Sequence, residues 1–332
     1  MRLVSWLLMG LLLALPSCVS SGDMHDAPKG LTTGPLHTQP YQFGTLPGTQ
    51  VDTDHYRIYT TLRDPNYQRL LANVLEAAHQ RFSTLNPETT VPGPMDCYVF
   101  GDRSTWELHT RLHGGSNSLV YLQISSGGYS QQGVFVGYDI GRTSTLSVIA
   151  HEAWHQYSWF AFKDRLPSWL DEGIATQSEA IDWNGDQPTF RPEQNYRRFL
   201  ALKQAVHENR LWKIADLLPT HAGRVIALSD KHVDSYYAQV WSIVLFMEHS
   251  HYQKNLHQLL ADATKGKLRE CLNGTGIMPA EIEGSSEHWN TVAGPRYFEK
   301  YISSDLPTFE REYVEFVTKL TSSWPVRIPE GR

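Results

Sequence analysis

The sequence predicts an α+β fold, in which a small mixed sheet with its helices comes first and a mainly helical domain follows. Three short stretches rich in β-branched and aromatic residues alternate with helical patterns in the first half of the chain, at residues 55–61, 95–100 and 133–138. Beyond Pro192 the apolar residues recur almost throughout at helical spacing. An apolar content of 41% is enough for sizeable cores, so this is not a disordered chain.

The first 17 residues are expected to be a secretory signal peptide. Arg2 is followed by an apolar run from Leu3 to Leu15 that only Ser5 and Gly10 interrupt. A run of this length after a charged start is typical of a cleaved leader, whereas a membrane-spanning helix needs about 20 apolar residues. The remaining chain of about 315 residues is long enough for two domains.

The end of this leader, Leu-Pro-Ser-Cys, resembles the bacterial lipobox, in which the cysteine becomes the lipidated first residue of the mature protein. Cys18 would then carry acyl chains that anchor the protein to a membrane without spanning it. Val19 is not the aspartate that usually retains lipoproteins at the inner membrane. The resemblance therefore favours the outer membrane of a bacterial cell envelope, with the protein facing the periplasm; plain secretion is the alternative.

The charge of the chain does not indicate a nucleic-acid partner. Without the leader, 28 basic residues, one fewer than the 29 of the whole chain, face 35 acidic ones, so the net charge is −7. No basic cluster and no basic helix face stands out. Neither nucleic acid nor anionic lipid is therefore expected as a partner.

The chain divides into a linker and two domains. Residues 18–48 are rich in Ser, Gly, Pro and Thr and poor in aliphatic residues, so they are expected to form a flexible linker. Residues 49–182 contain the predicted strands, and residues 183–332 form the mainly helical C-terminal domain. The other two cysteines, Cys97 and Cys271, could form a disulfide in an oxidising compartment or remain two buried thiols.

The first domain is expected to alternate strands and helices. The expected elements are a strand at 55–61, a helix at 65–85, a strand at 95–100, a helix at 103–112 capped by Asp102, and strands at 119–124 and 133–138. On the second helix, His109 and His113 stand four residues apart and could mimic a pair of metal ligands. No acid with a clear role accompanies them, so we expect an ordinary surface or core pair.

The stretch His151-Glu152-Ala153-Trp154-His155 reads H-E-x-x-H. On a helix, positions i and i+4 lie one turn apart on the same face, so the imidazoles of His151 and His155 can converge on one ion, for which zinc is expected. Catalytic zinc takes three protein ligands and leaves a fourth position for water. Glu152 lies one position round the helix, too poorly placed to be a ligand, and would act as the general base.

Glu172 is the expected third ligand. It follows His155 after sixteen intervening residues, in a segment where Pro167 ends one helix and Ser168 can cap the next. Two antiparallel helices joined by a short loop would bring its carboxylate back beside the histidines. Gly173 lacks a side chain and would let the second helix approach the first closely.

Together with the segment Trp169-Leu170-Asp171-Glu172-Gly173-Ile174-Ala175, the H-E-x-x-H stretch resembles the gluzincin branch of the zinc metallopeptidases, and most closely the bacterial peptidase MA-like proteins. The specific motifs cover about thirty residues. The resemblance implies a zincin-like, thermolysin-type first domain with two metal-bearing helices, a Zn²⁺ cofactor and a peptide or protein substrate. In gluzincins an edge strand binds extended substrate, and residues 133–138 hold the corresponding place in chain order; an ordinary sheet strand is the alternative.

Two supporting roles stay open in the sequence. Thr176 and Glu179 follow the third ligand at helical spacing, and either could orient a ligand imidazole. Gluzincins commonly supply an oxyanion donor, Tyr or His, from the C-terminal domain. The Y-A-Q-x-W segment that begins at Tyr237 resembles that of the peptidase MA-like proteins, so Tyr237 is the expected donor, with Tyr236 and His232 as alternatives and plain helix packing as the other interpretation.

The expected function is zinc-dependent hydrolysis of peptide bonds. Endopeptidase action is modestly favoured, because no segment resembles the G-x-M-E-N motif of zinc aminopeptidases. One alternative is an envelope-anchored binding or assembly module with a structural zinc, although a purely structural site would not need Glu152. Another is a non-peptide metallohydrolase. The sequence specifies neither the natural substrate nor the oligomeric state.

Overall fold

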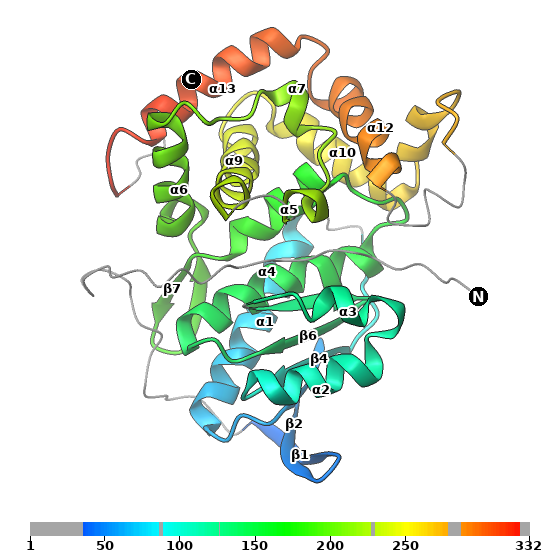
Figure 1. Cartoon of the computed structure of the whole chain (residues 1–332), viewed down its shortest axis with the longest axis vertical. Helices are drawn as coiled ribbons and strands as arrows, with labels where there is room; N and C mark the ends of the chain where they lie inside the picture. The colour runs from blue at the N-terminus through cyan, green and yellow to red at the C-terminus, as the bar shows by residue number, and fades with distance from the viewer. Residues whose placement is uncertain (1–35, 86–88, 126, 227–229, 278–286, 326–332) are drawn as a thin grey trace.

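The computed structural model describes residues 36–85, 89–125, 127–226, 230–277 and 287–325. Over these residues the chain is a mixed α+β protein, as the sequence predicts, with a six-stranded sheet, a two-stranded sheet and many helices. In Figure 1 the larger sheet and its helices form the lower half of the molecule, and the C-terminal helices, coloured yellow to red, form the upper half.

The larger sheet is mixed and has the strand order β1-β2-β3-β4-β6-β5. Its strands are β1 (His37–Phe43), β2 (Leu46–Asp52), β3 (Tyr56–Thr60), β4 (Met95–Phe100), β5 (Gly128–Gln131) and β6 (Val134–Tyr138). The pairs β3–β4 and β4–β6 are parallel, and the other pairs are antiparallel. The two longest-range pairings therefore lie in the middle of the sheet, and hairpins form both ends.

The edge strand differs from the expectation. Residues 133–138 correspond to β6, which lies between β4 and β5, so the assignment of this strand to the edge is wrong. The cause is a tight hairpin, in which Gln132 and Gly133 both have positive φ angles, 51° and 77°, as a two-residue type I′ turn requires. The chain before this turn pairs with β6 as β5, although Gly-Tyr-Ser-Gln has no clear strand pattern.

The predicted linker ends earlier than expected. β1 and β2 form an antiparallel hairpin, so the flexible-linker prediction is wrong for residues 37–48. Composition is a poor guide here because Phe43 is the only buried side chain of β1, and backbone pairing with β2 defines the strand. The rest of that linker, the signal peptide and Cys18 lie outside the described residues.

Four helices accompany the sheet: α1 (Pro65–Leu85), α2 (Arg103–His113), α3 (Ser118–Tyr121) and α4 (Arg142–Ala161). The predicted cap of α2 is confirmed, because the Asp102 side chain accepts a hydrogen bond from the backbone N–H of Thr105. The strand expected at residues 119–124 is wrong, since α3 occupies this place. Tyr121 of α3 is buried, and its ring stacks on that of Tyr129 in β5, with the ring centroids 3.8 Å apart.

The second half of the chain is mainly helical, as predicted. After α5 (Ser168–Ala175) and a hairpin of β7 (Ile181–Asn184) and β8 (Gln187–Phe190) come α6 (Tyr196–His207), α7 (Ile214–Leu217), α8 (Ala222–Ile226), α9 (Asp230–Glu248), α10 (Gln253–Lys265), α12 (Glu287–Tyr297) and α13 (Leu306–Leu320). The predicted boundary between residues 182 and 183 falls inside β7. One hydrophobic cluster contains buried residues from Val51 to Leu320, so both halves contribute to the same core.

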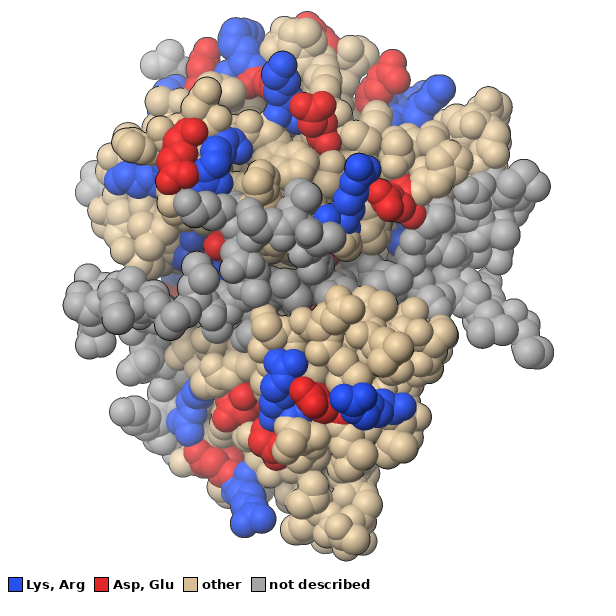
Figure 2. Space-filling model, viewed as in Figure 1, with Lys and Arg blue, Asp and Glu red and all other residues tan. Residues whose placement is uncertain are grey.

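Two further features of the described parts of the chain are the apolar character of the helices and the distribution of surface charge. No helix there combines the length and the apolar character that crossing a bilayer requires. Acidic and basic side chains are mixed over both halves of the face in Figure 2.

Cys97 and Cys271 are free thiols, and the Cys97 thiol contacts the Gln156 side chain at 3.3 Å.

Candidate metal centre

Helix α4 is the central helix of the molecule. It packs against α1 and against strands β5 and β6, and every residue from Thr145 to Tyr157 except Ser147 is buried, so almost no face of this part is left to solvent. Helix α4 is therefore a core helix, although its buried side chains include the polar ones of His151, Glu152, His155 and Gln156. The H-E-x-x-H stretch is therefore held rigidly, with its histidines and Glu152 inside the protein.

Helix α5 carries Glu172 and begins one residue earlier than expected, at Ser168, with Pro167 in the capping position. The Ser168 backbone N–H donates to the Asn290 side chain of α12, which satisfies one of the N–H groups at the start of the helix. The role expected of Gly173 is also different. A Cβ atom there would lie 2.6 Å from a methyl carbon of Val244, so the missing side chain allows close approach to α9 and not to α4.

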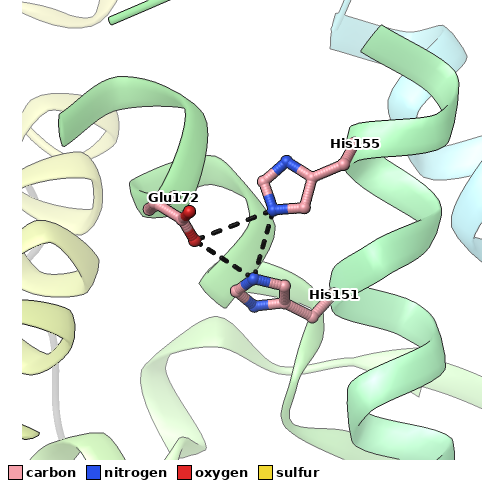
Figure 3. A group of neighbouring side chains, drawn as sticks. All are labelled: His151, His155 and Glu172. Atoms are coloured by element: carbon pink, nitrogen blue, oxygen red, sulfur yellow. Dashed lines mark hydrogen bonds and ion pairs between the residues drawn. The ribbon is translucent and has the colours of Figure 1, made fainter. Parts of the chain in front are cut away.

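The three predicted ligands come together (Figure 3). His151 Nε2 and His155 Nε2 lie 3.3 Å apart, and Glu172 Oε2 lies 3.3 Å from the first and 3.7 Å from the second. Two ligand atoms that each lie about 2.1 Å from a tetrahedral zinc ion are about 3.4 Å apart. The three observed separations therefore match three edges of a zinc-centred tetrahedron. Among the described residues, no other group of His, Cys, Asp and Glu meets the same spacing.

The surroundings of the Glu172 carboxylate would also suit a cation. Its side chain is fully buried and neither oxygen has a hydrogen-bond partner, although Oε2 lies within ion-pair distance of both histidines. A buried carboxylate without hydrogen bonds is costly unless a positive charge or a metal ion compensates it. Asp171, Glu152 and Glu179 are buried nearby on the same helices or directly after them, so negative charge accumulates around the histidines.

Glu179 orients the imidazole ring of His151 through Nδ1, the ring nitrogen that is not in the ligand group. Its Nδ1 lies 2.9 Å from Glu179 Oε1, and the same carboxylate accepts two hydrogen bonds from Arg198, at 2.8 and 2.7 Å, and one from Asn195 at 2.9 Å. Thr176 instead donates to the backbone carbonyl of Gly173 at 2.7 Å. Of the two candidates left open by the sequence, Glu179 therefore occupies the place of the orienting partner.

Asp171 has the corresponding position beside the other ligand histidine. Its Oδ2 lies 3.4 Å from His155 Nδ1, and its Oδ1 accepts a hydrogen bond of 2.7 Å from the Trp154 indole. Sequence reasoning missed this residue, although it directly precedes Glu172. With Glu179, it places a carboxylate behind each of the two imidazoles, so both Nε2 atoms face inward.

These carboxylates change the proton affinities of the site. Burial lowers the pKa of His151, but the carboxylates of Glu172 and Glu179 outweigh it and raise the pKa to about 9. Burial raises the pKa of Glu172, yet His151 and His155 lower it overall to about 2. The surroundings thus stabilise positive charge on the imidazole side and negative charge on Glu172, and a divalent cation satisfies both preferences.

Glu152 lies next to His151 in sequence and is not part of the ligand group. Its Oε2 accepts a hydrogen bond of 2.9 Å from the Ser130 hydroxyl of β5, and its Oε1 is buried without a partner. Burial raises the pKa of this carboxyl. One oxygen is held and the other is available, which is the arrangement that a proton acceptor needs.

The candidate oxyanion donors differ in their surroundings. Tyr237 is buried with its ring 6.4 Å from the ring of His151, whereas His232 is exposed on the same helix. The Tyr236 hydroxyl points to the carbonyl of Thr220 at 3.5 Å. Tyr237 is therefore the best placed of the three residues that the sequence offers.

His221, just before α8, was missed by the sequence analysis. Its Nδ1 accepts a hydrogen bond from the backbone N–H of Gly223 at 3.0 Å, so the neutral ring carries its proton on Nε2. That Nε2 is buried and has no partner. Burial and the nearby Arg165 lower the pKa of this ring, and the negative charge of Glu172 opposes this lowering only in part. A neutral N–H donor therefore lies near the ligand group.

No family model matches the chain, and no curated protein matches it either. The interpretation of the site rests on the geometry described above and on the sequence motifs.

Proposed function

We propose that this protein is a zinc-dependent peptide hydrolase of the gluzincin type, with a zincin-like first domain. The observation that carries the proposal is the spacing of His151 Nε2, His155 Nε2 and Glu172 Oε2, which matches the edges of a zinc tetrahedron. These three residues would hold Zn²⁺. A bound zinc ion would polarise the substrate carbonyl and make water a stronger acid at neutral pH.

Glu152 is the general base in this proposal. Its free Oε1 accepts a proton from the attacking water, and the protonated carboxyl then gives that proton to the leaving amine. Because the site is buried, competing water is excluded and the charges act at low dielectric. The Tyr237 hydroxyl would stabilise the oxyanion from the C-terminal half, and the Nε2–H of His221 would be a second donor.

The edge of the sheet offers a place for an extended substrate. β5 pairs with β6 on one side and is the last strand of the sheet, so an extended peptide would pair with its other side. Ser130 of β5 contacts Glu152, which brings this edge next to the base. Backbone recognition of this kind supports an endopeptidase. Anchoring at a bacterial envelope through Cys18 remains part of the proposal on the strength of the leader sequence alone.

The test uses the zinc-loaded protein and its Glu152→Gln variant with casein as a general substrate. We expect both to bind one zinc ion, and the variant to cleave casein about 10²- to 10⁴-fold more slowly, because the base is lost while the ligands remain. Glu76→Gln is the matched control, since Glu76 is a half-buried acid on α1 that pairs with His55. Unchanged cleavage by Glu152→Gln would contradict the mechanism, and no cleavage by either zinc-loaded form would favour a binding module.

A further inference from the structure

We propose that Ser130 is a positioning residue, whose hydroxyl fixes the orientation of the Glu152 carboxylate and couples it to the strand that binds substrate. This inference rests on the proposed function for its catalytic meaning. Its structural part, the control of the carboxylate orientation, can be tested without any activity.

The contact itself is specific. Ser130 Oγ donates to Glu152 Oε2 at 2.9 Å and also lies 3.3 Å from the backbone carbonyl of the same residue. Both side chains are almost completely buried, Ser130 at 4% exposure and Glu152 at 0%. Without the hydroxyl, no hydrogen bond that the structure shows would restrain the carboxylate, and its two oxygens would become equivalent acceptors.

The position of the hydroxyl is fixed by the hairpin that carries it. Ser130 pairs with Phe135 across the β5–β6 hairpin, whose two-residue turn leaves little freedom of register. A Cβ atom at Gly128 would lie 2.6 Å from the carbonyl oxygen of Val136, so the two strands already touch at the other end of β5. The strand therefore cannot shift easily relative to β6.

A second side chain of α4 holds the same hairpin. Gln156 lies one helical turn after Glu152, and its amide donates to the carbonyl of Gly133 in the hairpin turn at 2.8 Å and to the carbonyl of Asp96 in β4 at 2.8 Å. Residues at i and i+4 lie on the same helix face, so α4 is fastened to the hairpin at two successive turns. The Ser130–Glu152 contact thus belongs to a rigid connection between helix and sheet edge.

This arrangement has a consequence for catalysis. The strand that would align a peptide through its backbone is the strand that orients the base, so substrate and proton acceptor are placed by the same element. Holding Oε2 leaves Oε1 as the oxygen without a hydrogen-bond partner, which would take the proton. Errors of about 1 Å in such positioning can cost about a hundredfold in rate.

The experiment compares the zinc-loaded wild type with two variants. Ser130→Ala removes the hydroxyl, and Ser130→Thr keeps it. Thr110→Val is the control, because it deletes another buried hydroxyl that contacts β5, through Tyr129 at 3.4 Å, away from Glu152. We expect Ser130→Ala to bind zinc normally and to lower kcat about tenfold to a hundredfold with KM within about twofold, while Ser130→Thr recovers most of the loss.

A second readout is independent of activity. In a crystal structure of zinc-loaded Ser130→Ala, we expect the Glu152 carboxylate to be rotated or to occupy more than one orientation, whereas wild type and Thr110→Val show one. An unchanged single orientation, or a kcat within twofold of wild type, would overturn the inference. If wild type cleaves no peptide at all, the proposed hydrolase function fails, and the carboxylate orientation alone decides the role of Ser130.

Discussion

Two histidine pairs with the same spacing lie in the first half of this protein and have opposite surroundings. His109 and His113 on α2 have ring centroids 4.6 Å apart, and His151 and His155 on α4 have ring centroids 5.1 Å apart. The spacing of four residues therefore brings the rings together equally well in both helices. What differs is the set of neighbours supplied by the rest of the fold.

The first pair packs on aromatic rings, with His109 close to Phe43, Tyr98 and Phe100. Burial and the neighbouring His113 lower the pKa of His109 to about 4. The carboxylates around His151 raise its pKa to about 9 despite burial. Helical spacing creates a pair of rings, and the partners brought in by tertiary structure make the pair a core contact or a candidate cation site.

The largest difference between the pairs should appear in metal content. We expect the His155→Ala variant to lose its bound zinc and the His113→Ala variant to keep one zinc ion per chain, because only the first removes one of three converging ligands. Zinc is measured by mass spectrometry after dialysis against metal-free buffer, and circular dichroism checks that both variants are folded. Stoichiometric zinc in His155→Ala would show that the site on α4 is not the one that binds the metal.

The pH dependence of zinc binding tests whether the carboxylates around His151 raise its pKa. A metal ligand must be a neutral imidazole, so zinc has to displace the proton that His151 binds below a pKa of about 9 in the metal-free protein. The apparent affinity should rise about tenfold per pH unit between pH 6 and 8 for each proton displaced. Competition with a chelator of known affinity measures it. An affinity that stops rising near pH 6.5 would mean that the carboxylates do not act on this pair.

A smaller effect is expected from a carboxylate behind a ligand. Asp171→Asn keeps an oxygen for the Trp154 indole but removes the negative charge 3.4 Å from His155 Nδ1. Because such partners orient ligands and raise their basicity, we expect zinc binding to weaken about tenfold, the lower end of the usual range. Glu76→Gln is the control, since it changes the acid beside a histidine outside the site. Equal zinc affinity of both variants and wild type would remove Asp171 from the metal centre.

The sequence predicted the parts of this site that local geometry determines. His151, Glu152 and His155 lie within five residues of one helix, and Glu172 returns on the next helix after a short loop, so motif and spacing were sufficient. The overall α+β class followed from alternating strand and helix patterns in the same way. These predictions needed no knowledge of how distant segments pack.

Contacts between distant segments were not predictable by the same means. Ser130 reaches Glu152 only because an unpatterned segment folds back as β5, and Arg198 supports Glu179 from a helix of the second half. The β1–β2 hairpin is likewise defined by backbone pairing and not by its side chains. No sequence motif includes His221. Each of these features depends on tertiary packing, which residue composition and periodicity do not record.

The smallest effect is expected at the first pair, His109 and His113, which packs on aromatic rings. His109 has a pKa near 4 when folded and an ordinary pKa near 6.5 when unfolded, so the unfolded chain binds the extra proton between these values and stability is lost as pH falls from 6.5 to 4. His109→Phe should remove this loss, because phenylalanine fits among aromatic neighbours and leaves no buried ring nitrogen without a partner. Urea unfolding of the metal-free proteins should show a gain on the order of 1 kcal/mol for the variant at pH 4.5, and a smaller one at pH 7. A gain that is the same at both pH values would mean that His109 is not held neutral by its packing, and the contrast with His151 would then rest on metal binding alone.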